Sequence, residues 1–215
     1  MDHQSAVWDE LLGAGFLHGL RDAHREATLA VFGSLTRAAG FKERTFGIAA
    51  FDNLESQIDR VFEDDERVFR DDLNQSPGWR FGPYRVLLKR HPFGNVRGIR
   101  WDRDSPTKQA VARQGYADGR QLALDLGLTP RDTPDVVTLV LAHSASDEPL
   151  EMELFLGQPR MNDDGGPAWR WLRPLDDTLG GDPRRKLVAR PLPLWGDDEA
   201  DVPMRLRDET STETA

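Results

Sequence analysis

The chain of 215 residues contains no cysteine and no long apolar run, and these absences exclude several classes of protein. Without cysteine it can form no disulfide bond, thiolate metal site, iron–sulfur cluster or cysteine nucleophile. No apolar stretch approaches the length of a membrane-spanning helix, and the N-terminal region lacks the basic-then-apolar pattern of a secretory signal. We therefore expect a cytoplasmic protein with no membrane partner.

The chain also lacks an excess of positive charge, because 37 Asp and Glu outnumber 28 Lys and Arg and the formal net charge is −9. A global electrostatic footprint for nucleic acid is therefore absent. From Gly196 onward seven acids stand against two arginines, so this end contributes −5 of the total. We predict a single domain over residues 1–190 and a disordered acidic tail over 191–215.

The first third of the chain has the three- and four-residue apolar spacing of amphipathic helices. We predict helices within roughly residues 5–72. The most regular pattern is a stripe formed by Phe51, Leu54, Ile58, Val61 and Phe62. A turn-rich break at 74–78 marks the point where the helical part should stop.

The segments after the break have the composition of strands. Tyr84–Arg90 and Val96–Asp102 flank a short connection and predict one β-hairpin. Val136–Ala142 and Leu150–Leu156 predict a second hairpin, and Trp169–Leu175 predicts a further strand. Between the two hairpins, Ser105 followed by proline predicts the start of a helix.

These elements predict the α+β class, in which an N-terminal helical layer packs on a mostly antiparallel sheet. We expect about four or five strands over residues 84–175. The apolar stripe of Phe51 to Phe62 should be buried against the sheet face that carries Val137, Leu139 and Leu141.

The segment His91 to Arg100 reads His-Pro-Phe-Gly-Asn-Val-Arg-Gly-Ile-Arg. It resembles the signature of Fic-type AMP transferases, His-Pro-Phe-x-Asp/Glu-Gly-Asn-Gly-Arg-x-x-Arg. The resemblance implies that His91 would be a general base, with Asn95, Arg97 and Arg100 at the nucleotide phosphates. This sequence lacks two residues after Phe93, including the acid that holds magnesium in that family, and a hairpin turn explains the segment without catalysis.

The same region also suggests a nucleic-acid contact, because cationic and aromatic residues alternate along it. The residues that would form this contact are Arg85, Lys89, Arg90, Arg97, Arg100 and Trp101. The alternative is a solvated sheet face whose cations pair with the acids of the Glu63–Glu66 run.

No metal or cofactor site is predicted. His18 and His24 are six residues apart, an interval that does not align them on one helix face, so we expect surface or capping histidines. Glu151 and Glu153 share a strand face, but no lysine follows them to complete a nuclease-type metal site.

The order of elements resembles a group of uncharacterised bacterial proteins encoded beside helix-turn-helix regulators with ImmA/IrrE-type metallopeptidases. The segments that carry the resemblance are Leu87–Arg90, Pro106–Ala110, Thr138–Glu153 and Trp169–Leu175. It implies a bacterial accessory protein that works with a DNA-binding regulator or in a stress or defence module, and it transfers no catalytic residue. Our leading hypothesis is a non-enzymatic binding or regulatory protein with a protein partner. The nucleotide transferase and the nucleic-acid-binding protein are the alternatives.

Overall fold

The computed structural model describes residues 3–103, 105–114, 136–147 and 149–175. Within these ranges the chain begins with three helices, α1 (His3–Gly13), α2 (Phe16–Ser34) and α3 (Glu43–Val61). A short 3-10 helix, η1 (Arg37–Ala39), lies between α2 and α3. Helices α1 and α2 are separated at Gly15, whose φ of 81° is the left-handed conformation that glycine adopts without strain.

Six strands form one sheet in the described part of the chain, and their spatial order follows the sequence. The strands are β1 (Val68–Arg70), β2 (Gly78–Phe81), β3 (Tyr84–Arg90), β4 (Val137–Asp147), β5 (Leu150–Pro159) and β6 (Trp169–Pro174). Neighbouring strands run antiparallel except β3 and β4, which are parallel. The α+β class with a mostly antiparallel sheet is thus confirmed, with more strands than expected.

Two of the strand predictions are confirmed by the pairing. The second hairpin is formed by β4 and β5, whose register places Leu141 opposite Leu156. The predicted strand at Trp169 is β6, which pairs with β5. Helix α4 (Pro106–Arg113) begins where the sequence indicated, with Ser105 as its N-cap and proline in its first turn.

The first predicted hairpin is wrong. Strand β3 pairs with β2 and β4, and the chain after it forms a 3-10 helix, η2 (Val96–Gly98). The physical reason lies in Val96, Ile99 and Trp101, which do not alternate as strand residues do and are all buried in the core. The predicted helical range was also too long, because it included β1, a strand too short to show alternation.

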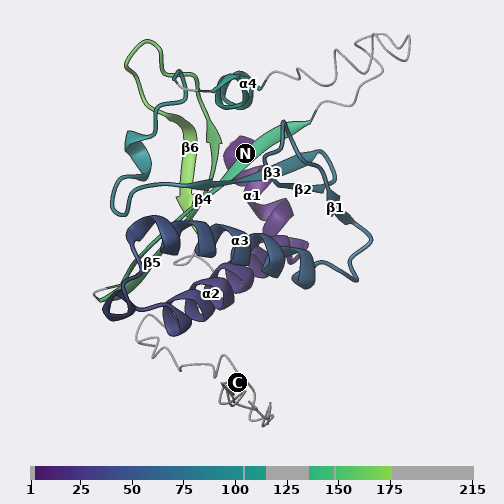
Figure 1. The fold of residues 1–215 in the computed structure, drawn as a ribbon. Helices are drawn as coiled ribbons and strands as arrows, with labels where there is room; N and C mark the ends of the chain where they lie inside the picture. The colour runs from purple at the N-terminus through teal and green to yellow at the C-terminus, as the bar shows by residue number, and fades with distance from the viewer. Residues whose placement is uncertain (1–2, 104, 115–135, 148, 176–215) are drawn as a thin grey trace, which may run out of the picture.

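Each face of the sheet is covered by a different layer. Helices α2 and α3 lie side by side on one face, and α4 lies on the other (Figure 1). The core on the α2–α3 side contains Leu20, Leu54, Ile58, Val86, Leu139 and Leu141. The core on the α4 side contains Leu87, Ile99, Trp101, Val111, Val140 and Trp169.

The predicted burial of the α3 stripe is confirmed at three of its five positions, Leu54, Ile58 and Phe62, and only in part at Phe51. The exception is Val61, the last residue of α3, whose exposed fraction is 43%. Gly19 of α2 allows the end of this stripe to approach, because a β-carbon there would lie 2.6 Å from the Phe62 ring. The predicted acidic tail, 191–215, lies outside the described residues.

Candidate functional site

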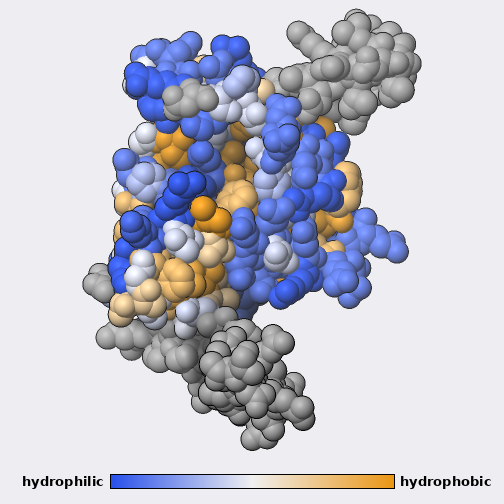
Figure 2. Space-filling view, viewed as in Figure 1, coloured by the Kyte–Doolittle hydropathy of each residue, from blue (hydrophilic) through white to orange (hydrophobic). Residues whose placement is uncertain are grey.

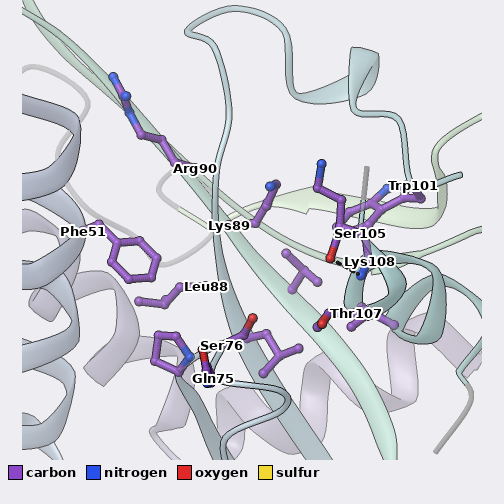
Figure 3. Close-up of a pocket in the computed structure, with 14 residues that line it drawn as sticks. Phe51, Gln75, Ser76, Leu88, Lys89, Arg90, Trp101, Ser105, Thr107 and Lys108 are labelled. Carbon is purple, nitrogen blue, oxygen red and sulfur yellow. Dashed lines mark hydrogen bonds between the residues drawn. The ribbon is translucent and has the colours of Figure 1, made fainter. Parts of the chain in front are cut away.

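A pocket of about 380 Å³ opens beside β3 at the point where β2 ends (Figure 3). The β2 ladder stops at Leu87, whereas β3 continues to Arg90. The next contact on this side is the N–H of Leu88, which donates to the carbonyl of Pro77 at 3.4 Å. We call this cavity the β3-edge pocket, and its floor is the edge of β3 beyond Leu87.

The wall on the β2 side is the turn that interrupts the sheet. Asn74 and Gln75 both have positive φ, at 47° and 66°, and an isolated bridge joins Leu73 to Ser76. This tight turn brings Ser76 and Pro77 to the pocket. The sequence had indicated a turn-rich break here, and the structure gives it a role in shaping a cavity.

The β3-edge pocket has an apolar end and a polar end. Phe51 of α3 and Leu88 lie at one end, and Trp101, Ser105 and Lys108 lie at the other. Apolar residues are visible between α3 and α4 in the space-filling view, bordered by hydrophilic ones (Figure 2). A ligand that fits both ends must itself combine apolar and polar groups.

The charged residues around the pocket have one sign. Lys89, Arg90 and Lys108 line it, and no carboxylate among the described residues does so. The net charge of the whole chain, by contrast, is −9. A concave wall of one sign concentrates ligands of the opposite sign, here anionic ones.

Arg90 is held beside the pocket by helix α3. Its guanidinium group pairs with Glu43 and lies against Gly47, where a β-carbon would overlap it. Arg37 and Arg90 together hold the pKa of Glu43 below its usual range. Because Glu43 therefore stays ionised, Arg90 is anchored at one end of the pocket.

Trp101 is the most buried of the polar groups at the pocket, with an exposed fraction of 2%. Its backbone N–H donates to the side chain of Asn162 at 3.0 Å, and its ring stands edge-on to Trp169 at 5.3 Å. Trp169 in turn donates its indole N–H to the carbonyl of Val96 at 3.0 Å. The indole N–H of Trp101 has no hydrogen-bond partner.

The structure brings together half of the residues predicted to contact nucleic acid. Lys89, Arg90 and Trp101 meet at the β3-edge pocket. Arg85 is buried and bound by Asp71 through two hydrogen bonds of 2.9 and 2.8 Å. Arg100 is paired with Asp102 and Arg97 is exposed on η2, so no single surface contains all six. Contact with nucleic acid stays a prediction.

The alternative was that these cations pair with the Glu63–Glu66 run. Arg85, Arg90 and Arg100 have other partners. Their partners are Asp71, Glu43 and Asp102 respectively.

The His91 segment does not form the site that the transferase resemblance implies. His91 is buried, and its Nδ1 donates to the carbonyl of Pro92 at 3.0 Å. The N–H of Gly94 donates to the Glu153 carboxylate at 2.9 Å, so this backbone amide is already bound by an internal anion. The segment is also preceded by strand β3, where the Fic-type family has a helix.

Asn95, also in the transferase set, lies against Gly98, where a β-carbon would meet its amide. A second hollow of about 460 Å³ is lined by Arg90, His91, Phe93 and Ser144. Because the imidazole of His91 is not exposed to solvent, it is not available there as a base.

Sequence reasoning missed a buried histidine pair. His24 of α2 and His143 of β4 meet edge-on with ring centres 6.0 Å apart. The expectation that His24 would be a surface or capping residue is wrong, since it is buried. A signal was present, because His24 follows Leu20 by four residues on the apolar stripe of α2.

No group of three or more histidine, aspartate or glutamate side chains in the described ranges is arranged to hold a metal ion. Among the described helices, none combines the length and apolarity that crossing a bilayer requires. Comparison of the chain with protein-family models, curated proteins and solved structures found no match.

Proposed function

We propose that this protein acts by binding, and that the β3-edge pocket receives an acidic, partly apolar segment of a partner protein. The observation that carries the proposal is the lining of the pocket, where Lys89, Arg90 and Lys108 surround an apolar floor without a described carboxylate. Charge complementarity of this kind selects a partner and raises its rate of association.

The backbone of β3 favours a polypeptide as the ligand. The N–H of His91 donates across the sheet to His143, whereas the N–H of Leu88 points to the opposite side. Because backbone groups alternate along a strand, those of Arg90 point to the same open side as those of Leu88. An extended segment can therefore form main-chain hydrogen bonds with this edge while its side chains enter the pocket.

The burial of Trp101 argues against a nucleic acid as the ligand of this pocket. Base stacking on a protein requires an exposed aromatic face. Only 2% of Trp101 is exposed. An accessory role beside a bacterial DNA-binding regulator stays a prediction, and in that role the regulator would supply the acidic segment.

Fluorescence anisotropy with a labelled peptide that alternates glutamate with valine and phenylalanine tests the proposal. We expect the peptide to bind, and a peptide with lysine in place of glutamate not to bind. Lys108→Glu should weaken binding by about tenfold or more, because it places a like charge in the pocket. Arg97→Glu is the matched control, since Arg97 is an exposed cation outside the pocket and should have little effect.

Equal binding of the two peptides, or equal effects of the two substitutions, would contradict the proposal. A single-stranded oligonucleotide is the third ligand in this experiment. If it binds more tightly than the acidic peptide and loses affinity in Lys108→Glu, the pocket is a nucleic-acid site and the protein-partner proposal is wrong.

A further inference from the structure

The second hollow, of about 460 Å³, adjoins the β3-edge pocket at the end of β3. Arg90 lines both cavities, so they meet at the last residue of this strand. Figure 3 shows the side chain of Arg90 extending away from Leu88 and Phe51. A segment that is bound along the edge of β3 and continues past Arg90 therefore reaches the second hollow.

The second hollow lies where β3 ends and β4 continues. Arg90 and His143 form the last pair of the β3–β4 ladder, whereas β4 runs on to Asp147. The N–H of His91 still donates to the carbonyl of His143, at 3.2 Å. Because backbone groups alternate along a strand, those of Ala145 point to the side that β3 has left. Ala145 lines the hollow, so a bound segment that passes the end of β3 can form main-chain hydrogen bonds there.

The lining of the second hollow favours an apolar side chain over a charged one. Its charged residues in the described part of the chain, Glu43 and Arg90, are paired with each other. The imidazole of His91 is shielded, and burial lowers its pKa, so it is neutral at pH 7. Phe93 lines the same hollow with an exposed fraction of 40%. Because two aromatic rings attract each other beyond the area that they bury, an aromatic side chain suits this lining.

The separation of the two cavities sets the spacing of the side chains that fill them. Leu88 lies at the apolar end of the β3-edge pocket, and Pro92, four residues later, lines the second hollow. Four residues of extended chain span about 13 Å. Side chains four residues apart in an extended segment point to the same face. One helix, α3, borders both cavities on this face, through Phe51 and Glu43.

We infer that the second hollow is an anchor subsite for an aromatic side chain of the acidic partner segment, four residues from the apolar side chain that contacts Phe51 and Leu88. The inference rests on the proposed function, because it specifies a second contact made by that segment. Phe93 packs against the bound ring, and the backbone of Ala145 holds the segment beside it.

Isothermal titration calorimetry with a set of acidic peptides tests this inference. Each peptide keeps the glutamates and has one central valine as the apolar side chain. Phenylalanine stands four residues before the valine in one peptide and four residues after it in another, and each has a counterpart with alanine at the same position. We expect one of the two phenylalanine peptides to bind about tenfold more tightly than its alanine counterpart. Glutamate at that position should bind no more tightly than alanine.

Phe93→Ser should remove most of the gain from phenylalanine while leaving the alanine peptides unchanged. Phe69→Ser is the matched control, because Phe69 is also an exposed phenylalanine, at 53%, but lines neither cavity. Both side chains are exposed, so neither substitution should prevent folding. The backbone amide of Ala145 gives a second readout. Its exchange with solvent should slow in the complex with the tighter phenylalanine peptide.

The outcomes separate this inference from the proposed function. Alanine and phenylalanine peptides that bind equally at both positions would overturn the anchor subsite and leave the acidic-segment proposal standing. Failure of every peptide to bind would overturn both. A gain from phenylalanine that survives in Phe93→Ser, or that Phe69→Ser removes equally, would place the aromatic side chain elsewhere and show that this inference is wrong.

Discussion

Arg90 crosses helix α3 at Gly47, and a β-carbon at this glycine would overlap the guanidinium group. The approach brings Arg90 to Glu43, one turn earlier on the same helix. Gly47 and Glu43, both far from Arg90 in the sequence, thus hold its guanidinium group at one end of the β3-edge pocket.

Gly47→Ala should displace Arg90 without lowering the stability of the fold. Alanine favours the helix over glycine by about 1 kcal/mol, and the atoms that must move belong to the end of a flexible side chain. We therefore expect the free energy of unfolding in urea to be unchanged or slightly increased. Binding of the acidic peptide should weaken several-fold, because Arg90 is displaced from its anchored position. Unchanged peptide affinity would show that Arg90 has no part in the site.

Gly19→Ala should have the opposite effect on stability. A β-carbon at Gly19 would lie 2.6 Å from the ring of Phe62, which is packed against Phe16 with ring centres 4.9 Å apart. Overpacking typically costs about 1–3 kcal/mol, which exceeds the gain in helix propensity. Gly13→Ala is the control, since nothing lies within 4 Å of the added carbon. Urea denaturation should show a loss only for Gly19→Ala, and equal stability of both variants would contradict the close packing of α2 on α3.

The structure of this region could be predicted from the sequence only in part. The β4–β5 hairpin follows from local alternation, and the start of α4 follows from Ser105 and the proline after it. The pairing of β3 with β4 could not be read locally, because it joins segments separated by the whole of 91–136. For the same reason Lys89 and Trp101 could be named as candidates, whereas their meeting with Phe51 of α3 could not.

Arg85 and Arg100 looked alike in the sequence, and the structure predicts different costs for their removal. Arg85 is 8% exposed and bound at two points to Asp71, so Arg85→Ala leaves a partly buried carboxylate with only the more distant Arg80, at 3.8 Å, as a cationic partner. We expect a loss of about 3 kcal/mol in the free energy of unfolding. Arg100 pairs with Asp102 at an exposed position, so Arg100→Ala should cost at most about 1 kcal/mol. Thermal and urea unfolding of the two variants provide the measurement, and similar losses would contradict the assignment of Arg85 to the core.

The buried histidine pair predicts that the fold loses stability in mild acid. Burial lowers the pKa of His24 to about 4, and burial together with the neighbouring His24, His91 and Arg90 lowers the pKa of His143 well below its ordinary value. In the unfolded chain both would titrate near pH 6.5. The unfolded state therefore binds more protons once the pH falls below about 6.5, and stability declines until the pH reaches about 4. His24 alone accounts for a loss on the order of 3 kcal/mol over this window.

The free energy of unfolding between pH 7 and pH 5 measures this effect. Glu43 of α3, which lines the same hollow as the two histidines, has a lowered pKa and stays ionised in this range. His143→Gln should make the pH dependence shallower than in the wild type, whatever its effect on stability at pH 7. An identical slope would mean that His143 does not titrate in the unfolding reaction.

Chemical-shift mapping of the β3-edge pocket tests the central claim most directly. The acidic peptide is titrated into the ¹⁵N-labelled full chain, and backbone and indole resonances are followed. We predict that the perturbed residues cluster at Ser76, Leu88 to Arg90, Trp101 and Thr107 to Lys108, around the pocket in Figure 3. Perturbations confined to other surfaces, or none at saturating peptide, would contradict the account.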